Sequence, residues 1–247
     1  MNKIIQLIKT IIIIFIFVLN ALLFIFPALP FFFISLFAFK QAMGHIIYKL
    51  AQCVARVGIF LTGCSMTVTG RENIPKKGRV CFVANHVGIF DILLAAAYAG
   101  RSFGFIAKKE LRGLPVFNIW VSLLGGLFID RKNPRKAIKT INLGIKRIKA
   151  GGAMLIFPEG TRSRGRGIGP FLPGALKLAT QSEAIIVPVA ISGSYEVFEK
   201  TYRIHSTPVA IHFLPPVNPM EISAGDRKAA LAEKLHDEIA EVLLQQN

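Results

Sequence analysis

Acidic residues are scarce in this sequence, and cysteines are few. Only 14 Asp and Glu stand against 30 Lys and Arg, which gives a formal net charge of +16 and a pI near 10.1. The three cysteines, Cys53, Cys64 and Cys81, show no metal-ligand spacing and cannot all pair, so we expect reduced thiols without a functional role. The sequence also lacks an internal repeat, a nucleotide-binding glycine fingerprint and a metal-ligand cluster. We therefore expect no metal and no tightly bound cofactor.

The excess of positive charge predicts an anionic partner. Nucleic acid, an anionic bilayer surface and phosphorylated substrates all fit such a charge. The sequence contains no recognisable nucleic-acid-binding motif, so we expect no nucleic acid as a partner. An apolar N-terminus favours anionic membrane lipids, because basic residues beside a bilayer are attracted to its negative surface.

The N-terminal part of the chain has no charged residue between Ile11 and Phe39. Hydrophobic residues make up 53% of the chain and its mean hydropathy is +0.52, which is high for a soluble protein. As one helix the uncharged stretch would be about 44 Å long, more than the ~30 Å of a hydrocarbon core. Pro27 and Pro30 predict a break between residues 11–26 and a second apolar limb that begins at Phe31.

The flanks of this stretch carry positive charge on both sides. Lys3 and Lys9 precede it, whereas Lys40, Lys49 and Arg56 follow it. By the positive-inside rule both flanks belong in the cytoplasm, which favours a re-entrant hairpin over a single spanning helix. A signal peptide is disfavoured because the apolar run is longer than ~15 residues and no small-residue cleavage site follows.

A second N-terminal feature is an apolar stripe at helical spacing. It predicts an amphipathic helix that either lies on the membrane interface or packs against the rest of the protein. The stripe consists of Ile46, Ile47, Leu50, Val54 and Val57. We therefore divide the chain into a membrane-embedding helical segment, residues 1–62, and a second domain, residues 63–247.

From residue 66 onward, short apolar runs alternate with helical patterns between Gly, Pro and charged turns. Such alternation predicts an α/β fold with helices on the faces of the sheet. The expected strands are 66–69, 79–84, 103–107, 127–130, 153–157, 184–191 and 209–214. The expected helices are 91–99, 116–124, 134–149, 174–180 and 227–244.

The stretch NHVGIFD, residues 85–91, lies between an expected strand and an expected helix. On one helix, residues five apart point about 140° away from each other. His86 and Asp91 can therefore meet only if His86 lies in the turn and Asp91 begins the helix. The carboxylate would then fix the imidazole tautomer and leave the other ring nitrogen as a general base. Alternatively, His86 is a surface residue and Asp91 merely favours the helix N-terminus.

NHVGIFD resembles the H-x-x-x-x-D motif of the glycerolipid acyltransferases that acylate lysophosphatidic acid. Three further blocks follow in that family's order: GGLFIDR at 125–131, FPEGTRS at 157–163 and IVPVAI at 186–191. The resemblance covers roughly residues 65–220 and implies the glycerolipid acyltransferase fold, a mixed sheet flanked by helices, with a membrane-embedding N-terminus. In the last block, Pro188 predicts an edge strand or a bulge, because proline cannot donate to a sheet ladder.

The resemblance also implies roles for residues in these blocks. Arg131 and Arg162 are expected to bind the acceptor's phosphate. Alternatively, each forms a structural ion pair, Arg131 with Asp130 or another surface acid and Arg162 with Glu159. Glu159 is expected to orient Arg162 or to bind the glycerol hydroxyls, in a turn that Gly160 and Thr161 complete. Lys108, in a segment similar to the family's basic segment, is expected to stabilise the oxyanion or contact the thioester.

The resemblance, with the apolar N-terminus and the positive charge, implies a membrane-associated 1-acyl-glycerol-3-phosphate acyltransferase, which we expect at the cytoplasmic face of the inner membrane. His86 and Asp91 would activate the sn-2 hydroxyl of lysophosphatidic acid, which attacks an acyl thioester and gives phosphatidic acid. The donor is acyl-CoA or acyl-ACP, and in the second case acyl carrier protein is a partner. Two alternatives remain: acylation of another lysolipid or an amine-bearing lipid, and a non-catalytic tether to anionic membranes.

Overall fold

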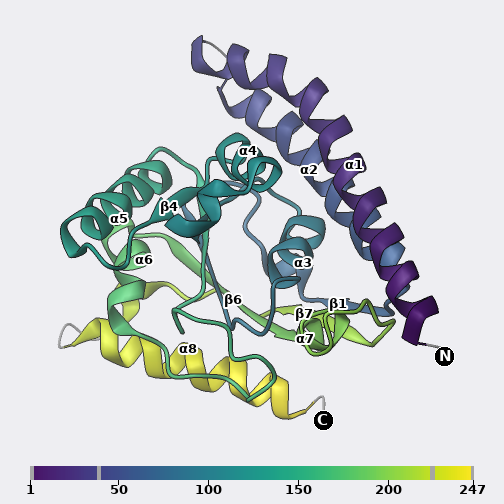
Figure 1. Cartoon of the computed structure of the whole chain (residues 1–247). Helices are drawn as coiled ribbons and strands as arrows, with labels where there is room; N and C mark the ends of the chain where they lie inside the picture. The colour runs from purple at the N-terminus through teal and green to yellow at the C-terminus, as the bar shows by residue number, and fades with distance from the viewer. Residues whose placement is uncertain (1–2, 38–39, 223–225, 246–247) are drawn as a thin grey trace.

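A pair of long helices lies along one side of an α/β body in the computed structural model, which describes residues 3–37, 40–222 and 226–245 (Figure 1). The helices are α1 (Lys3–Phe37), α2 (Lys40–Thr62), α3 (Asp91–Tyr98), α4 (Pro115–Leu123), α5 (Pro134–Lys149), α6 (Lys177–Ser182), α7 (Ser194–Val197) and α8 (Arg227–Leu244). The strands are β1 (Met66–Thr69), β2 (Val80–Ala84), β3 (Gly104–Lys108), β4 (Leu127–Ile129), β5 (Ala153–Ile156), β6 (Ile185–Ser192) and β7 (Val209–Phe213).

The strands form one seven-stranded mixed sheet within the described residues, in the order β1-β7-β6-β2-β5-β3-β4. Strands β6, β2, β5, β3 and β4 run parallel to one another, β7 is antiparallel to β6, and β1 is parallel to β7. Every residue of β2 and β5 is buried, as expected for central parallel strands covered on both faces. The predicted mixed α/β sheet is confirmed, and the predicted strand bounds agree with the structure to within one residue.

Helices cover the two faces of the sheet with two apolar cores. One core contains Phe82 and Leu155 with residues of α2, α3 and α4. The other contains Val83 and Met154 with residues of α5, α6 and α8. Because neighbouring strand residues point to opposite faces, the same short strands contribute to both cores.

Helices α3, α4, α5 and α8 begin and end within one residue of their predicted bounds. Helix α5 is preceded by Asn133, whose side chain accepts a hydrogen bond from the backbone of Lys136, and has Pro134 at its first turn. Its buried residues lie on one face, and basic residues fill its last turn. The helix predicted at 174–180 differs: it begins at Lys177, after the 3-10 turn Pro173–Leu176.

The predicted break at Pro27 and Pro30 is wrong, because α1 continues through both prolines. Both proline rings are exposed, whereas Ala21, Ile25 and Ala28 on the opposite side of the helix are buried. Packing of this buried face holds the helix together although two backbone donors are missing. The predicted second apolar limb is therefore part of α1, which packs lengthwise against α2 (Figure 1). Residues 38–39 between the two helices lie outside the described residues.

Helix α1 also presents an apolar face to solvent. Its exposed large side chains recur at helical spacing and include Ile4, Ile11, Phe15, Leu22 and Phe26. Among the described helices it is the one whose length and composition would allow it to cross a membrane. Exposed apolar surface of this extent marks a site of contact with a membrane or another protein.

Helix α2 joins α1 to the body. Its predicted apolar stripe is partly buried: Ile47 and Val54 are covered, and Tyr48 joins the core beneath α3. The Tyr48 hydroxyl donates to the carbonyl of Ala96, and Gln52 donates to that of Ala97, each at 3.0 Å. Of the two arrangements predicted for this helix, packing against the domain is therefore observed.

Of the two alternatives predicted for Pro188, an edge strand or a bulge, the edge strand is wrong. Pro188 lies in β6, between β2 and β7, and is not at an edge of the sheet. The ladder between β6 and β7 begins at Val189, and the Pro188 carbonyl accepts a hydrogen bond from the backbone of Leu214 at 2.9 Å. Proline is tolerated there because this end of the ladder uses only its carbonyl.

Candidate active site

The predicted site residues follow the carboxyl ends of parallel strands. His86 follows β2, Glu159 and Arg162 follow β5, Lys108 ends β3, and Arg131 follows β4. Since β2, β5, β3 and β4 are parallel neighbours, these ends lie along one edge of the sheet. Open α/β sheets bind their ligands at this edge.

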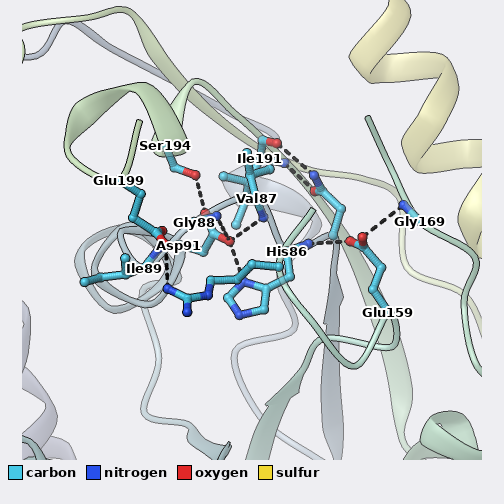
Figure 2. Close-up of polar contacts among 12 residues, drawn as sticks. His86, Val87, Gly88, Ile89, Asp91, Glu159, Gly169, Ile191, Ser194 and Glu199 are labelled. Carbon is cyan, nitrogen blue, oxygen red and sulfur yellow. Dashed lines mark hydrogen bonds and ion pairs between the residues drawn. The ribbon is translucent and has the colours of Figure 1, made fainter. Parts of the chain in front are cut away.

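His86 and Asp91 form the predicted pair. The Nδ1 atom of His86 lies 2.7 Å from Oδ2 of Asp91, with His86 in the turn after β2 and Asp91 at the start of α3 (Figure 2). Asp91 is fully buried, while the His86 side chain is 18% exposed. The carboxylate can therefore hold a proton on Nδ1 and leave the Nε2 lone pair available for general-base chemistry.

The Asp91 carboxylate accepts further hydrogen bonds that offset the free-energy cost of burying it. The backbone N–H groups of Val87 and Gly88 donate to Oδ2 at 2.7 and 3.0 Å. The buried Ser194 hydroxyl donates to Oδ1 at 2.5 Å. Sequence reasoning missed Ser194. Its one local signal is its place just after β6, at the same edge of the sheet.

The His86 ring is held by stacking as well as by Asp91. The Phe157 ring lies parallel to it, with 3.9 Å between centroids and an interplanar angle of 16°. None of the hydrogen bonds found among the described residues uses Nε2 of His86. The arrangement fixes the ring plane and leaves the nitrogen that would accept a substrate proton unoccupied.

Glu159 supports the backbone of the site. Its Oε1 accepts a hydrogen bond from the His86 N–H at 2.6 Å, and Oε2 accepts one from the Gly169 N–H at 2.9 Å (Figure 2). Burial raises the pKa of the Glu159 carboxyl, and these two hydrogen bonds act in the opposite direction. No contact between Glu159 and Arg162 is found among the described residues. The alternative role, in which Glu159 binds the glycerol hydroxyls, stays a prediction.

Arg162 is paired with a different carboxylate. Its Nη1 lies 2.6 Å from Oε1 of Glu199, in the segment after α7. The other oxygen of Glu199 accepts a hydrogen bond from the Ile89 N–H at 2.5 Å. Sequence reasoning missed Glu199, and no local pattern marks it, because Arg162 and Glu199 are 37 positions apart in the chain.

Arg131 reaches from the end of β4 to the FPEGTRS turn. Its Nη1 donates to the carbonyl of Gly160, which has the left-handed φ of 73° that glycine tolerates best. The alternative pairing of Arg131 with Asp130 is not observed, because Asp130 binds Lys109 at 3.0 Å. This contact lowers the pKa of the Asp130 carboxyl. Both predicted phosphate-binding arginines therefore lie at one turn.

Lys108 and Thr161 are exposed and complete the inventory of predicted residues. In the register of β3 and β4, Lys108 pairs with Ile129, and Ile129 is two residues before Arg131 in the sequence. Thr161 lies between Gly160 and Arg162 in the turn. In the described part of the chain, no group of three or more His, Cys, Asp or Glu side chains is placed to hold a metal ion.

Known proteins share this sequence pattern and fold. The sequence model of the acyltransferase family matches residues 65–192, more than half of the chain. The 1-acyl-sn-glycerol-3-phosphate acyltransferase of Borreliella burgdorferi is 30% identical over 200 residues, covering 81% of this chain and 80% of the relative. The protein of the same name in Saccharomyces cerevisiae is 30% identical over 208 residues, covering 83% and 67%.

A solved structure extends the likeness to the helical pair. The crystal structure of the 1-acyl-sn-glycerophosphate (LPA) acyltransferase PlsC from Thermotoga maritima matches with a TM-score of 0.80 and 25% identity. The match covers 96% of this chain and 97% of that one. On the family match, the relatives and the shared structure, this chain belongs to the acyltransferase family that includes the 1-acyl-sn-glycerol-3-phosphate acyltransferases.

Proposed function

We propose that this protein transfers an acyl chain from a thioester to the sn-2 hydroxyl of 1-acyl-glycerol-3-phosphate and so makes phosphatidic acid. The observation that carries the proposal is the His86–Asp91 pair, held at 2.7 Å beside two arginines that lie at one turn. The names of the relatives support the same reaction.

In the proposed mechanism His86 is the general base. Nε2 takes the proton of the sn-2 hydroxyl as its oxygen attacks the thioester carbonyl, and a tetrahedral oxyanion forms. Asp91 stabilises the resulting imidazolium through Nδ1. The oxyanion then collapses, the carbon–sulfur bond breaks, and the thiolate takes the proton back from His86. No acyl-enzyme is needed, because the acceptor hydroxyl attacks the donor directly.

Positive charge at the turn supports a phosphate subsite. Guanidinium groups bind phosphate through paired hydrogen bonds, and Arg131 and Arg162 both lie at the FPEGTRS turn. Glu159, Gly160 and Thr161 shape this turn and bring backbone groups close to the acceptor. Lys108, exposed at the end of β3, supplies a further cation for the oxyanion or the thioester.

We place the protein at the cytoplasmic face of the inner membrane. Residues 1–62 would embed through the exposed apolar face of α1, while the +16 charge attracts anionic lipids. Residues 63–247 would form the catalytic domain. The acyl donor is acyl-CoA or acyl-ACP, because either carrier presents the same thioester to the attacking hydroxyl.

The test is an acceptor and donor panel with purified protein in liposomes. We expect phosphatidic acid from 1-acyl-glycerol-3-phosphate with at least one of the two donors, and the preferred donor identifies the carrier. Transfer only to a phosphate-free lysolipid or to an amine-bearing lipid would contradict the acceptor assignment. Liposome binding without transfer to any acceptor would instead make the protein a membrane tether.

A further inference from the structure

The segment after β6 contributes two side chains to the site that the mechanism above does not use. Ser194 donates to Asp91, and Glu199 binds both Arg162 and the Ile89 N–H. We propose that Glu199 is a positioning residue that holds Arg162 ready for the acceptor's phosphate and links it to the loop that carries His86. This inference rests on the proposed function, because it assigns Glu199 to the same phosphate subsite.

The geometry divides the two oxygens of Glu199 between the two tasks. Oε1 lies 2.6 Å from Nη1 of Arg162. Oε2 lies 2.5 Å from the Ile89 nitrogen, and Figure 2 shows Glu199 beside Ile89. The Glu199 side chain is 11% exposed, whereas that of Arg162 is 34% exposed. The carboxylate is therefore largely shielded from water, and the guanidinium remains partly accessible to a ligand.

An arginine held in this way keeps its capacity to bind phosphate. A guanidinium has five N–H donors, and the contact with Glu199 uses those of one nitrogen. The rest can face a phosphate while the ion pair removes rotamers that point elsewhere. Ordering the side chain before the substrate arrives lowers the entropy lost on binding, so the affinity for the phosphate rises.

The contact with Ile89 ties this anchor to the catalytic loop. Ile89 lies three residues after His86, and its N–H is fixed by the same carboxylate that holds Arg162. Gly88 makes this approach possible, because a Cβ at that position would lie 2.9 Å from Oε2 of Glu199. A phosphate bound to Arg162 is thereby coupled to the position of the loop on which the base depends.

Two substitutions separate the two tasks. Glu199→Gln removes the negative charge but keeps an oxygen that can accept from the Ile89 N–H. We expect it to raise KM for 1-acyl-glycerol-3-phosphate by about tenfold, the effect of losing one charge-assisted hydrogen bond, with kcat nearly unchanged. Glu199→Ala removes both contacts, so we expect KM to rise and kcat to fall together.

The decisive comparison uses the Arg162→Ala background. If Glu199 acts through Arg162, Glu199→Gln produces no further rise in KM once Arg162 is gone. The matched control is Glu196→Gln, because Glu196 is in the same segment but pairs with Lys200 at 2.8 Å. We expect the control to leave KM and kcat unchanged. A tenfold rise that persists in the Arg162→Ala background, or that the control reproduces, overturns the proposal.

A second readout does not depend on turnover. Calorimetry measures the binding of glycerol 3-phosphate to the full chain and reports on the phosphate anchor alone. We expect the affinity to fall about tenfold in Glu199→Gln and to stay at the wild-type value in Glu196→Gln. If wild type binds this probe with an affinity that falls in Glu199→Gln but acylates no lysolipid, the proposed function fails and the role of Glu199 stands. If wild type does not bind it, the anchor and this proposal both fall.

Discussion

The ring of Phe157 covers one face of the His86 imidazole, with 3.9 Å between the two centroids. Phe157 follows β5 and His86 follows β2, so the contact depends on the pairing of these two strands. The stack and the Asp91 hydrogen bond act on different parts of the ring. The first fixes the tilt of the ring, and the second fixes the nitrogen that carries the proton.

We expect Phe157→Ala to lower kcat by roughly 10- to 100-fold, because an imidazole free to tilt is misplaced toward the hydroxyl. Phe157→Tyr keeps the ring and should retain most of the activity. Steady-state kinetics with lysophosphatidic acid check both variants. Equal kcat values in Phe157→Ala and wild type would show that the stack does not position the base.

Asp91→Asn should leave the fold intact and reduce kcat by about 10²- to 10⁴-fold. An asparagine oxygen in place of Oδ2 can still accept from Val87 and Gly88, while its amide donates to Ser194. The negative charge that stabilises the imidazolium is lost, however. Thermal unfolding measured beside kcat separates the two effects, and a kcat within twofold of wild type would argue against the role of Asp91.

Arg131→Ala should raise KM for lysophosphatidic acid by roughly tenfold or more, since it removes a cation from the phosphate subsite. Lys132→Ala is the matched control, because Lys132 is the next residue and is also exposed. Titration of both variants with the acceptor at a saturating donor concentration gives the comparison. Equal KM values for the two variants would remove Arg131 from the subsite.

Glu159 predicts a pH dependence of stability. Burial raises the pKa of the Glu159 carboxyl in the folded state. Folding therefore takes up a proton at pH values between the unfolded-state and the folded-state pKa. The favourable contribution of this carboxyl is present below the unfolded-state pKa and is lost as the pH rises through the folded-state value. Glu159→Gln lacks this titration. The unfolding free energy of wild type, compared with that of Glu159→Gln, should therefore be more favourable at pH 4 than at pH 7.

Denaturant unfolding of both proteins at the two pH values measures this difference. A difference that is constant, or that shifts toward the variant at low pH, would contradict the assigned cause. At pH 7 itself we expect Glu159→Gln to perturb the turn. Its amide oxygen can replace one carboxylate oxygen, but its amide nitrogen cannot accept, so the hydrogen bond from either the His86 or the Gly169 N–H is lost.

Local patterns predicted most of the strands and the His86–Asp91 pair, because a buried strand followed by a turn and a helix is encoded in consecutive residues. Those patterns failed where distant packing decides the outcome. Pro27 and Pro30 lie inside α1 because its other face is buried. The partner of Arg162 is Glu199, which only the return of the chain after β6 brings close. Ser194 reaches Asp91 for the same reason.

The central claim is that His86 removes the proton of the acceptor hydroxyl. The most direct measurement is phosphatidic acid formation from lysophosphatidic acid by wild type and His86→Ala, with each donor in liposomes. Glycerol 3-phosphate binding serves as the control for an intact phosphate subsite. Our account predicts product with wild type, and loss of product with retained binding in His86→Ala. Product formation by His86→Ala at the wild-type rate would contradict it.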